Sequence, residues 1–171
     1  MKKVILSFLV VFVAIAANAQ NLYLGGSFGI LHDDNADVTQ FSIAPEIGYN
    51  FNERWAVGGE ISYTHMKYDG DIKGNSFSIA PYARFSFYEN DLVRLFIDGQ
   101  VGFSTTKVDG TDSENGFEVG FKPGIAFRLC DHFSAIAKYG FLGYRDEYRG
   151  SSVSGLALSS EDLSIGFLYE F

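Results

Sequence analysis

The chain has 171 residues, of which 47% are hydrophobic and 16% aromatic, so it can form one packed or membrane-embedded domain and is not disordered. Of its 13 basic residues, Lys2 and Lys3 lie before position 20, which leaves 11 against 21 acidic residues and a net charge of −10 beyond that point. This acidity argues against nucleic acid as a partner, and the single cysteine, Cys130, excludes an intramolecular disulfide.

The first nineteen residues have the three parts of a cleavable secretory signal peptide. Lys2 and Lys3 form a basic start, residues 4–17 are apolar apart from Ser7, and residues 17–19 read Ala-Asn-Ala, which matches the cleavage pattern. The apolar run is shorter than the roughly 20 residues that a spanning helix needs. We therefore expect a signal peptide over residues 1–19 and a mature domain over residues 20–171.

After the signal peptide, the sequence alternates between apolar and polar residues. In residues 41–51, one side of the alternation carries Phe41, Ile43 and Ile47, and the other carries Ser42 and Glu46. A period of two is typical of a β-strand with two unlike faces. The same alternation predicts eight strands, over residues 22–30, 41–51, 55–63, 77–87, 93–103, 117–127, 133–141 and 163–171, and it puts Phe141 on the apolar face of the seventh.

Charged residues fall on the face opposite the apolar one in every predicted strand that carries them. In a soluble barrel or sandwich the charges would face water, whereas in a membrane barrel they line the interior. The charged face consists of Glu46, Glu60, Arg84, Arg94, Asp98, Glu118, Lys122, Arg128, Lys138, Asp162 and Glu170.

Three features favour the membrane alternative over a soluble, lipocalin-like periplasmic barrel. The strands are long enough for the 9–11 residues that a tilted spanning strand needs. Tight connections at residues 52–54, 89–92 and 130–132 alternate with long polar ones at 32–38, 68–75, 107–116 and 146–157. Aromatic residues also gather near both ends of the strands, as at the two interfaces of an outer-membrane barrel. The sequence thus predicts an all-β, eight-stranded, antiparallel, up-and-down transmembrane β-barrel.

An internal repeat fits this meander but raises a difficulty. Residues 41–45 and 77–81 both read Phe-Ser-Ile-Ala-Pro, and a related element ends at Pro123. Proline cannot donate a hydrogen bond to a ladder, and a closed barrel has no edge on which to place it. We expect a local bulge or a missing bond at each proline.

The chain resembles the small outer-membrane β-barrels of the outer membrane protein A and X type, in the version common in Bacteroidetes-type bacteria. The most specific part of the resemblance is the C-terminal stretch, which ends in Phe167, Tyr169 and Phe171 at alternate positions. The resemblance implies that these three residues act as the sorting signal read by the barrel assembly machinery. Members of the family differ in function, so the resemblance carries the fold better than an activity.

The interior of an eight-stranded barrel is just wide enough for side chains to fill it. Five basic residues on the charged face (Arg84, Arg94, Lys122, Arg128 and Lys138) nearly balance the acidic ones, which favours a paired plug over a narrow porin-like pore. We expect an integral outer-membrane protein with a structural or surface-interaction, adhesion-like role.

Candidate chemical sites are weak. His32 lies among Asp33, Asp34 and Asp37, but the spacing matches no ordered calcium loop, and a solvated acidic loop is the preferred interpretation. The His132-Phe133-Ser134 stretch lies at a predicted tight turn with no clear carboxylate to orient the imidazole. We therefore expect no catalysis, cofactor or metal, a monomer, and contacts with outer-membrane lipid and lipopolysaccharide.

Overall fold

The computed structural model describes residues 21–33, 38–67, 72–158 and 162–171, without the side chains of residues 31–33 and 38. Within these ranges no helix is long and apolar enough to cross a membrane. The chain forms ten strands: β1 (Leu22–Asp33), β2 (Val38–Asn50), β3 (Trp55–Lys67), β4 (Lys73–Glu89), β5 (Val93–Val108), β6 (Glu114–Cys130), β7 (Phe133–Lys138), β8 (Phe141–Tyr148), β9 (Ser151–Ala157) and β10 (Ser164–Glu170).

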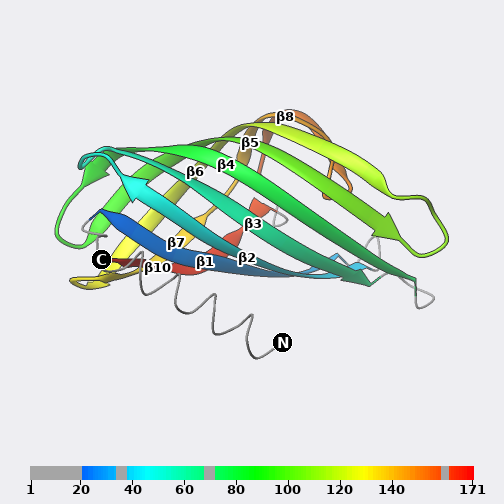
Figure 1. The fold of residues 1–171 in the computed structure, drawn as a ribbon, viewed down its shortest axis with the longest axis horizontal. Helices are drawn as coiled ribbons and strands as arrows, with labels where there is room; N and C mark the ends of the chain where they lie inside the picture. The colour runs from blue at the N-terminus through cyan, green and yellow to red at the C-terminus, as the bar shows by residue number, and fades with distance from the viewer. Residues whose placement is uncertain (1–20, 34–37, 68–71, 159–161) are drawn as a thin grey trace, which may run out of the picture.

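All strand pairs are antiparallel, and the ring closes through β1 with β10 and β5 with β6. Strands β7 and β8 pair with successive parts of β6 and together act as one strand of the barrel wall. Strands β10 and β9 pair with β7 and β8 in the same way and together act as the next one, so the ten strands form an eight-stranded wall. Figure 1 shows the strands winding obliquely around the long axis. The prediction of an eight-stranded antiparallel up-and-down barrel is confirmed.

The two ends of the barrel differ in their connections. Asn52 accepts hydrogen bonds from the backbone N–H groups of Arg54 and Trp55, both at 2.9 Å, and Asn90 accepts in the same way from Leu92 and Val93. These side-chain bonds close the tight turns, which is why asparagine stands there. The first described strand begins and the last one ends at this end as well, since the N–H of Phe171 donates to the carbonyl of Leu22. We call it the terminal end and the opposite one the loop end.

The three prolines lie where a ladder is interrupted. Residues 44–45 lack partners on β3 although the register before and after them is the same, and residues 80–81 lack partners on β5 in the same manner. Pro123 lies between the part of β6 that pairs with β8 and the part that pairs with β7. The expected missing bond therefore occurs at each proline, and at Pro45 and Pro81 it needs no bulge.

The seventh predicted strand, over residues 133–141, required correction. The strand is interrupted between β7 and β8 at Gly140, whose φ is +87°, and the alternation of inward and outward side chains changes phase there. As a result Phe141, which we expected on the lipid-facing side, is fully buried inside the barrel. The predicted long connection at 146–157 is also largely ordered, because β8 and β9 form a hairpin with its turn at residues 149–150.

The predicted apolar rows lie on the outside of the barrel. Most of their large side chains remain 36–74% exposed, from Phe117 at the low end to Ile30 at the high end. Aromatic rings meet across neighbouring strands there, as for Trp55 with Phe85 at 4.8 Å and Phe133 with Phe167 at 5.2 Å between centroids. A contiguous apolar surface of this extent is stable only in a non-aqueous medium.

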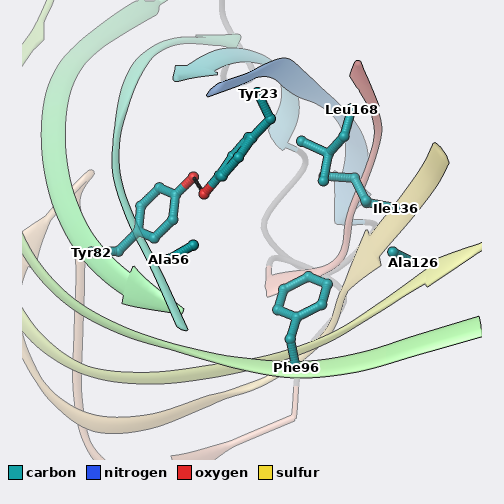
Figure 2. Packing of buried hydrophobic residues seen from close by; sticks show 7 residues of the cluster. All are labelled: Tyr23, Ala56, Tyr82, Phe96, Ala126, Ile136 and Leu168. Atoms are coloured by element: carbon teal, nitrogen blue, oxygen red, sulfur yellow. Dashed lines mark hydrogen bonds between the residues drawn. The ribbon is translucent and has the colours of Figure 1, made fainter. Parts of the chain in front are cut away.

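An apolar layer crosses the interior near the terminal end. It consists of seven buried side chains from seven strands: Tyr23, Ala56, Tyr82, Phe96, Ala126, Ile136 and Leu168. Figure 2 shows the hydroxyls of Tyr23 and Tyr82 meeting at its centre, 2.8 Å apart. Glycines on adjacent strands make room for the rings, because a Cβ on Gly58 would stand 2.6 Å from Tyr82 and one on Gly124 would stand 2.4 Å from Phe96.

Candidate functional site

A buried ion-pair network occupies the centre of the barrel. Arg84 donates two hydrogen bonds to Asp98, at 2.7 and 2.9 Å, and approaches Glu46 at 3.7 Å. Lys138 completes the network with contacts to Glu46 at 2.9 Å, Asp98 at 3.3 Å and Glu60 at 3.6 Å. Each buried charge thereby faces charges of the opposite sign, which is the condition for keeping it ionised away from water.

Arg84 lies between this network and the apolar layer. Its guanidinium is 4.1 Å from the ring centroid of Phe96, 5.2 Å from that of Tyr82 and 5.5 Å from that of Tyr23. The aromatic faces therefore stabilise the side of the cation that the carboxylates do not reach. The layer and the network form one continuous plug.

A second charged cluster lies nearer the loop end. Glu118 accepts hydrogen bonds from Arg145 and Gln100 and pairs with Lys122 at 3.1 Å. Arg145 also bonds to Asp162 at 2.9 Å. Its guanidinium lies 4.4 Å from the ring of Phe141, so the phase change at Gly140 supplies this cluster with an aromatic partner.

Arg149, at the tip of the β8–β9 hairpin, points back into the barrel. Its guanidinium donates to Glu60 at 3.2 Å, Ser78 at 3.2 Å and Ser62, and its backbone N–H donates to Ser104 at 3.0 Å. Arg149 has a φ of +57°, in the left-handed region that side chains rarely adopt. These bonds to β3, β4 and β5 hold the hairpin over the interior.

The third cluster lies at the terminal end, on the other side of the apolar layer. Glu89 bonds to both Arg94 and Arg128, and Arg94 reaches Glu170 at 2.8 Å. These side chains are partly exposed, with Arg128 the most exposed at 36%. Exposed pairs of this kind contribute little to stability.

The eleven charged residues predicted to line the interior therefore divide into separate groups, with Glu170 in the cluster at the terminal end. Glu46, Glu60, Arg84, Asp98 and Lys138 lie in the centre, Glu118, Lys122 and Asp162 lie in the cluster nearer the loop end, and Arg94 and Arg128 lie at the terminal end. Arg145 and Arg149 were missed, because they lie next to and within the long polar connection predicted at 146–157; the structure shows them bonded inside the barrel. The signal available in the sequence was the presence of two arginines in and beside a long polar stretch that could itself form a hairpin.

Two cavities beside the described interior residues share no lining residue. One, of about 80 Å³, lies toward the loop end beside Lys122, Lys138 and Arg145. The other, of about 340 Å³, opens at the terminal end beside Asn50, Trp55 and Arg94. Tyr23, Ala56 and Leu168 of the apolar layer line the second cavity and not the first.

The remaining candidate residues lie at the surface of the terminal end. Phe167 and Tyr169 face outward, and the ring of Tyr169 meets that of Phe171 at 5.0 Å. His132 contacts the backbone oxygen of Glu170 through Nδ1 at 2.9 Å, so that nitrogen is engaged. No group of three or more His, Cys, Asp or Glu residues among the described ones could hold a metal ion. Asp34 and Asp37 of the acidic loop lie outside the described residues.

A closed antiparallel barrel with an apolar exterior, a charged interior and alternating short and long connections defines an integral outer-membrane β-barrel protein. The family model for the outer membrane protein beta-barrel domain matches residues 4–171, and the chain belongs to that family. The protein is located in the bacterial outer membrane, which rules out the soluble periplasmic alternative.

Solved structures agree with this fold. Neisserial surface protein A superposes with a TM-score of 0.54 at 16% identity, covering 88% of this chain and 96% of that one. The N-terminal barrel domain of Pseudomonas aeruginosa OprF superposes with a TM-score of 0.50 at 17% identity, covering 89% and 98%. The Yersinia pestis attachment invasion locus protein, Ail, gives 0.47 at 17% identity over 86% and 92%. No curated protein sequence matches the chain.

Proposed function

We propose that the protein is a non-conducting, non-catalytic outer-membrane barrel with a structural role, and that it meets other molecules through its loop end. The observation that carries this proposal is the apolar layer of Figure 2, which lies across the interior between the two cavities. An ion would have to shed its water to pass Phe96, Leu168 and Ile136, all at most 2% exposed. The alternative of a narrow pore would require a continuous water-filled path through the barrel interior.

Strand length supports a surface role for the loop end. Strands β4, β5 and β6 have 17, 16 and 17 residues, whereas a tilted spanning strand needs about 9–11. Their excess length places ordered, pleated backbone beyond the apolar band at the loop end, where β5 and β6 remain paired as far as Thr106 and Glu114. We propose that this end faces the outside, in agreement with its longer connections.

Planar-bilayer recording tests the proposal directly. Purified chain, folded into vesicles and checked by its changed gel mobility before and after boiling, is expected to give no discrete conductance. A Phe96→Gly/Leu168→Gly variant removes one aromatic and one aliphatic side chain from the layer and serves as the comparison. Stepwise conductance of the unmodified chain would overturn the proposal in favour of the pore.

Three further parts belong to the proposal. Residues 1–19 act as the signal peptide, the mature barrel is a monomer, and Phe167, Tyr169 and Phe171 are read by the assembly machinery. The outward position of Phe167 and Tyr169 leaves both rings accessible from the membrane side. N-terminal sequencing of the outer-membrane form, with Gln20 expected first, tests the cleavage site.

A further inference from the structure

The tip of the β8–β9 hairpin leaves the barrel wall. The ladder between β8 and β6 ends at the pair of Asp146 with Phe117, and residues 147–150 beyond it form what we call the hairpin tip. The side chain of Tyr148 in this tip is 1% exposed, and the guanidinium of Arg149 bonds to β3 and β4 inside the barrel. The tip therefore covers part of the interior from the loop end.

Two glycines make room for the hairpin tip. A Cβ on Gly102 of β5 would stand 2.7 Å from the ring of Tyr148, and a Cβ on Gly116 of β6 would overlap the backbone of Glu147 and Tyr148. A ring can rotate away from such a contact, whereas two crossing backbones cannot. The inward position of the tip therefore depends on the absence of a side chain at residue 116.

The hairpin tip is strained, and one side chain supplies most of the bonds that hold it. Glu147 and Arg149, with φ of +47° and +57°, are the only non-glycine residues of the described chain with a positive φ. Such a conformation persists only where surrounding contacts hold it. Of the four hydrogen bonds that tie Arg149 to β3, β4 and β5, three come from its guanidinium. Loss of that one group from its site would therefore release the tip.

The backbone on either side of the tip can change direction without disturbing the wall. The register between β8 and β9 shifts between Arg145 and Tyr148, and a Cβ on Gly150, whose φ is +78°, would meet nothing within 4 Å. A bulge and a glycine are positions where a strand pair bends readily. The ladder of β8 with β6 stops at Asp146, so the tip can lift while that ladder stays intact.

Lifting the tip changes the charge of the interior. Outside the cluster at the terminal end, the ion pairs of the described interior join five carboxylates and five cations: Glu46, Glu60, Asp98, Glu118 and Asp162 with Arg84, Lys122, Lys138, Arg145 and Arg149. Without Arg149, five carboxylates face four cations, and Glu60 retains its contact with Lys138 at 3.6 Å. An uncompensated charge in such an interior is costly, so the lifted state attracts a cation.

We propose that the hairpin tip is a lid on the loop-end cavity and that Arg149 is the built-in occupant of a cation site beneath it. Tyr148, Arg149 and Ser151 form part of the lining of that cavity, so lifting the tip opens it to the outside. The open cavity accepts a small cation, such as an ammonium or guanidinium group, in place of the Arg149 side chain. The apolar layer lies below the cavity, so the lid opens no path through the barrel.

Thiol labelling of the folded chain in detergent micelles tests the proposal. A Ser104→Cys reporter places a thiol beneath the tip, where the hydroxyl oxygen now accepts from the backbone N–H of Arg149. The native Cys130 is exposed and serves as the reference for the intrinsic rate of each reagent. Peptide mass spectrometry reports the two thiols separately, and one cationic and one anionic methanethiosulfonate reagent are compared.

Two variants in the reporter background are expected to open the lid by different means. Arg149→Gln removes the charged hydrogen bonds and is expected to raise the labelling rate at position 104 about tenfold or more. Gly116→Ala keeps Arg149 but wedges the tip out of its recess, and the rate is expected to rise as well. In both variants the cationic reagent is expected to react severalfold faster than the anionic one, each relative to Cys130. Gly59→Ala, where a Cβ meets nothing within 4 Å, is the control and should keep the rate of the unmodified hairpin.

Three outcomes would overturn the proposal. An unchanged labelling rate in both variants would show that the tip does not move. An equal acceleration at an Ala126→Cys reporter, which is buried in the apolar layer, would show that the whole barrel has loosened and that no lid has opened. Equal relative rates for the two reagents would show that the open cavity has no preference for a cation. The gel-mobility assay confirms that each variant is folded, and no outcome depends on whether the barrel conducts.

Discussion

Arg84 and Asp98 stand directly opposite each other on β4 and β5, and their side chains form two parallel hydrogen bonds inside the barrel. Both side chains are at most 4% exposed. The fork of the guanidinium matches the two carboxylate oxygens, so the pair fixes the register of the two strands as well as neutralising two buried charges.

Removing Arg84 is therefore expected to be costly. The Arg84→Ala variant leaves Asp98 and Glu46 with Lys138 as the shared cation, and the loss is expected to be about 3–5 kcal/mol in the free energy of unfolding. Urea unfolding in vesicles measures it. The Arg128→Ala variant removes a half-exposed cation at the terminal end and is expected to cost less than about 1 kcal/mol. Equal losses for the two variants would contradict the buried-network account.

Two neighbouring glycines on β3 provide a matched test of the apolar layer. A Cβ on Gly58 would stand 2.6 Å from the ring of Tyr82 and 2.7 Å from the carbonyl oxygen of Ile47, whereas a Cβ on Gly59 would meet nothing within 4 Å. Gly58→Ala is expected to destabilise the barrel by about 1–3 kcal/mol through overpacking, and Gly59→Ala by less than about 0.5 kcal/mol. Thermal or urea unfolding of both variants measures the difference, and a similar effect at the two positions would be evidence against close packing in the layer.

The wall of the barrel was predictable because period-two alternation is a local property of the sequence. Arg84 and Asp98 could be placed on the inner face from the apolar residues on either side of them. The pairing of Arg84 with Asp98 could not be predicted, because it depends on the register between β4 and β5, which no residue within one strand determines.

Alternation failed after residue 138 for a physical reason. Gly140 adopts a positive φ and two successive residues then point inward, so every later position in that strand changes face. Phe141 was therefore placed on the lipid side, and Arg145, just before the predicted long connection, was not placed inside the barrel, whereas both are buried. A long polar stretch is a poor guide when its side chains can bond inside a charged barrel.

Arg149 gives a prediction about the β8–β9 hairpin. The Arg149→Gln variant loses the charged hydrogen bond to Glu60, which contributes roughly 1.5–3 kcal/mol when made by a charged group. Faster amide hydrogen exchange is expected in β8 and β9, with little change in β2 and β3. Arg54→Gln, in an exposed tight turn, is the control and should leave the exchange of β8 and β9 unaltered. Unchanged exchange in the Arg149→Gln hairpin would mean that Ser104 alone holds it.

Variants of the C-terminal aromatic residues test assembly in the cell independently of the stability of the barrel. Phe171 is 36% exposed and follows the last strand, and its backbone N–H bond to Leu22 does not need the ring. The Phe171→Ala variant is therefore expected to refold into vesicles with a change of less than about 1 kcal/mol. Its folded amount in outer-membrane extracts is nonetheless expected to fall severalfold if the assembly machinery reads the terminal ring. Phe51→Ala, at an exposed ring of the same end, should reduce neither quantity; equal outer-membrane amounts of the Phe171 variant and the unmodified chain would exclude the ring as a sorting signal.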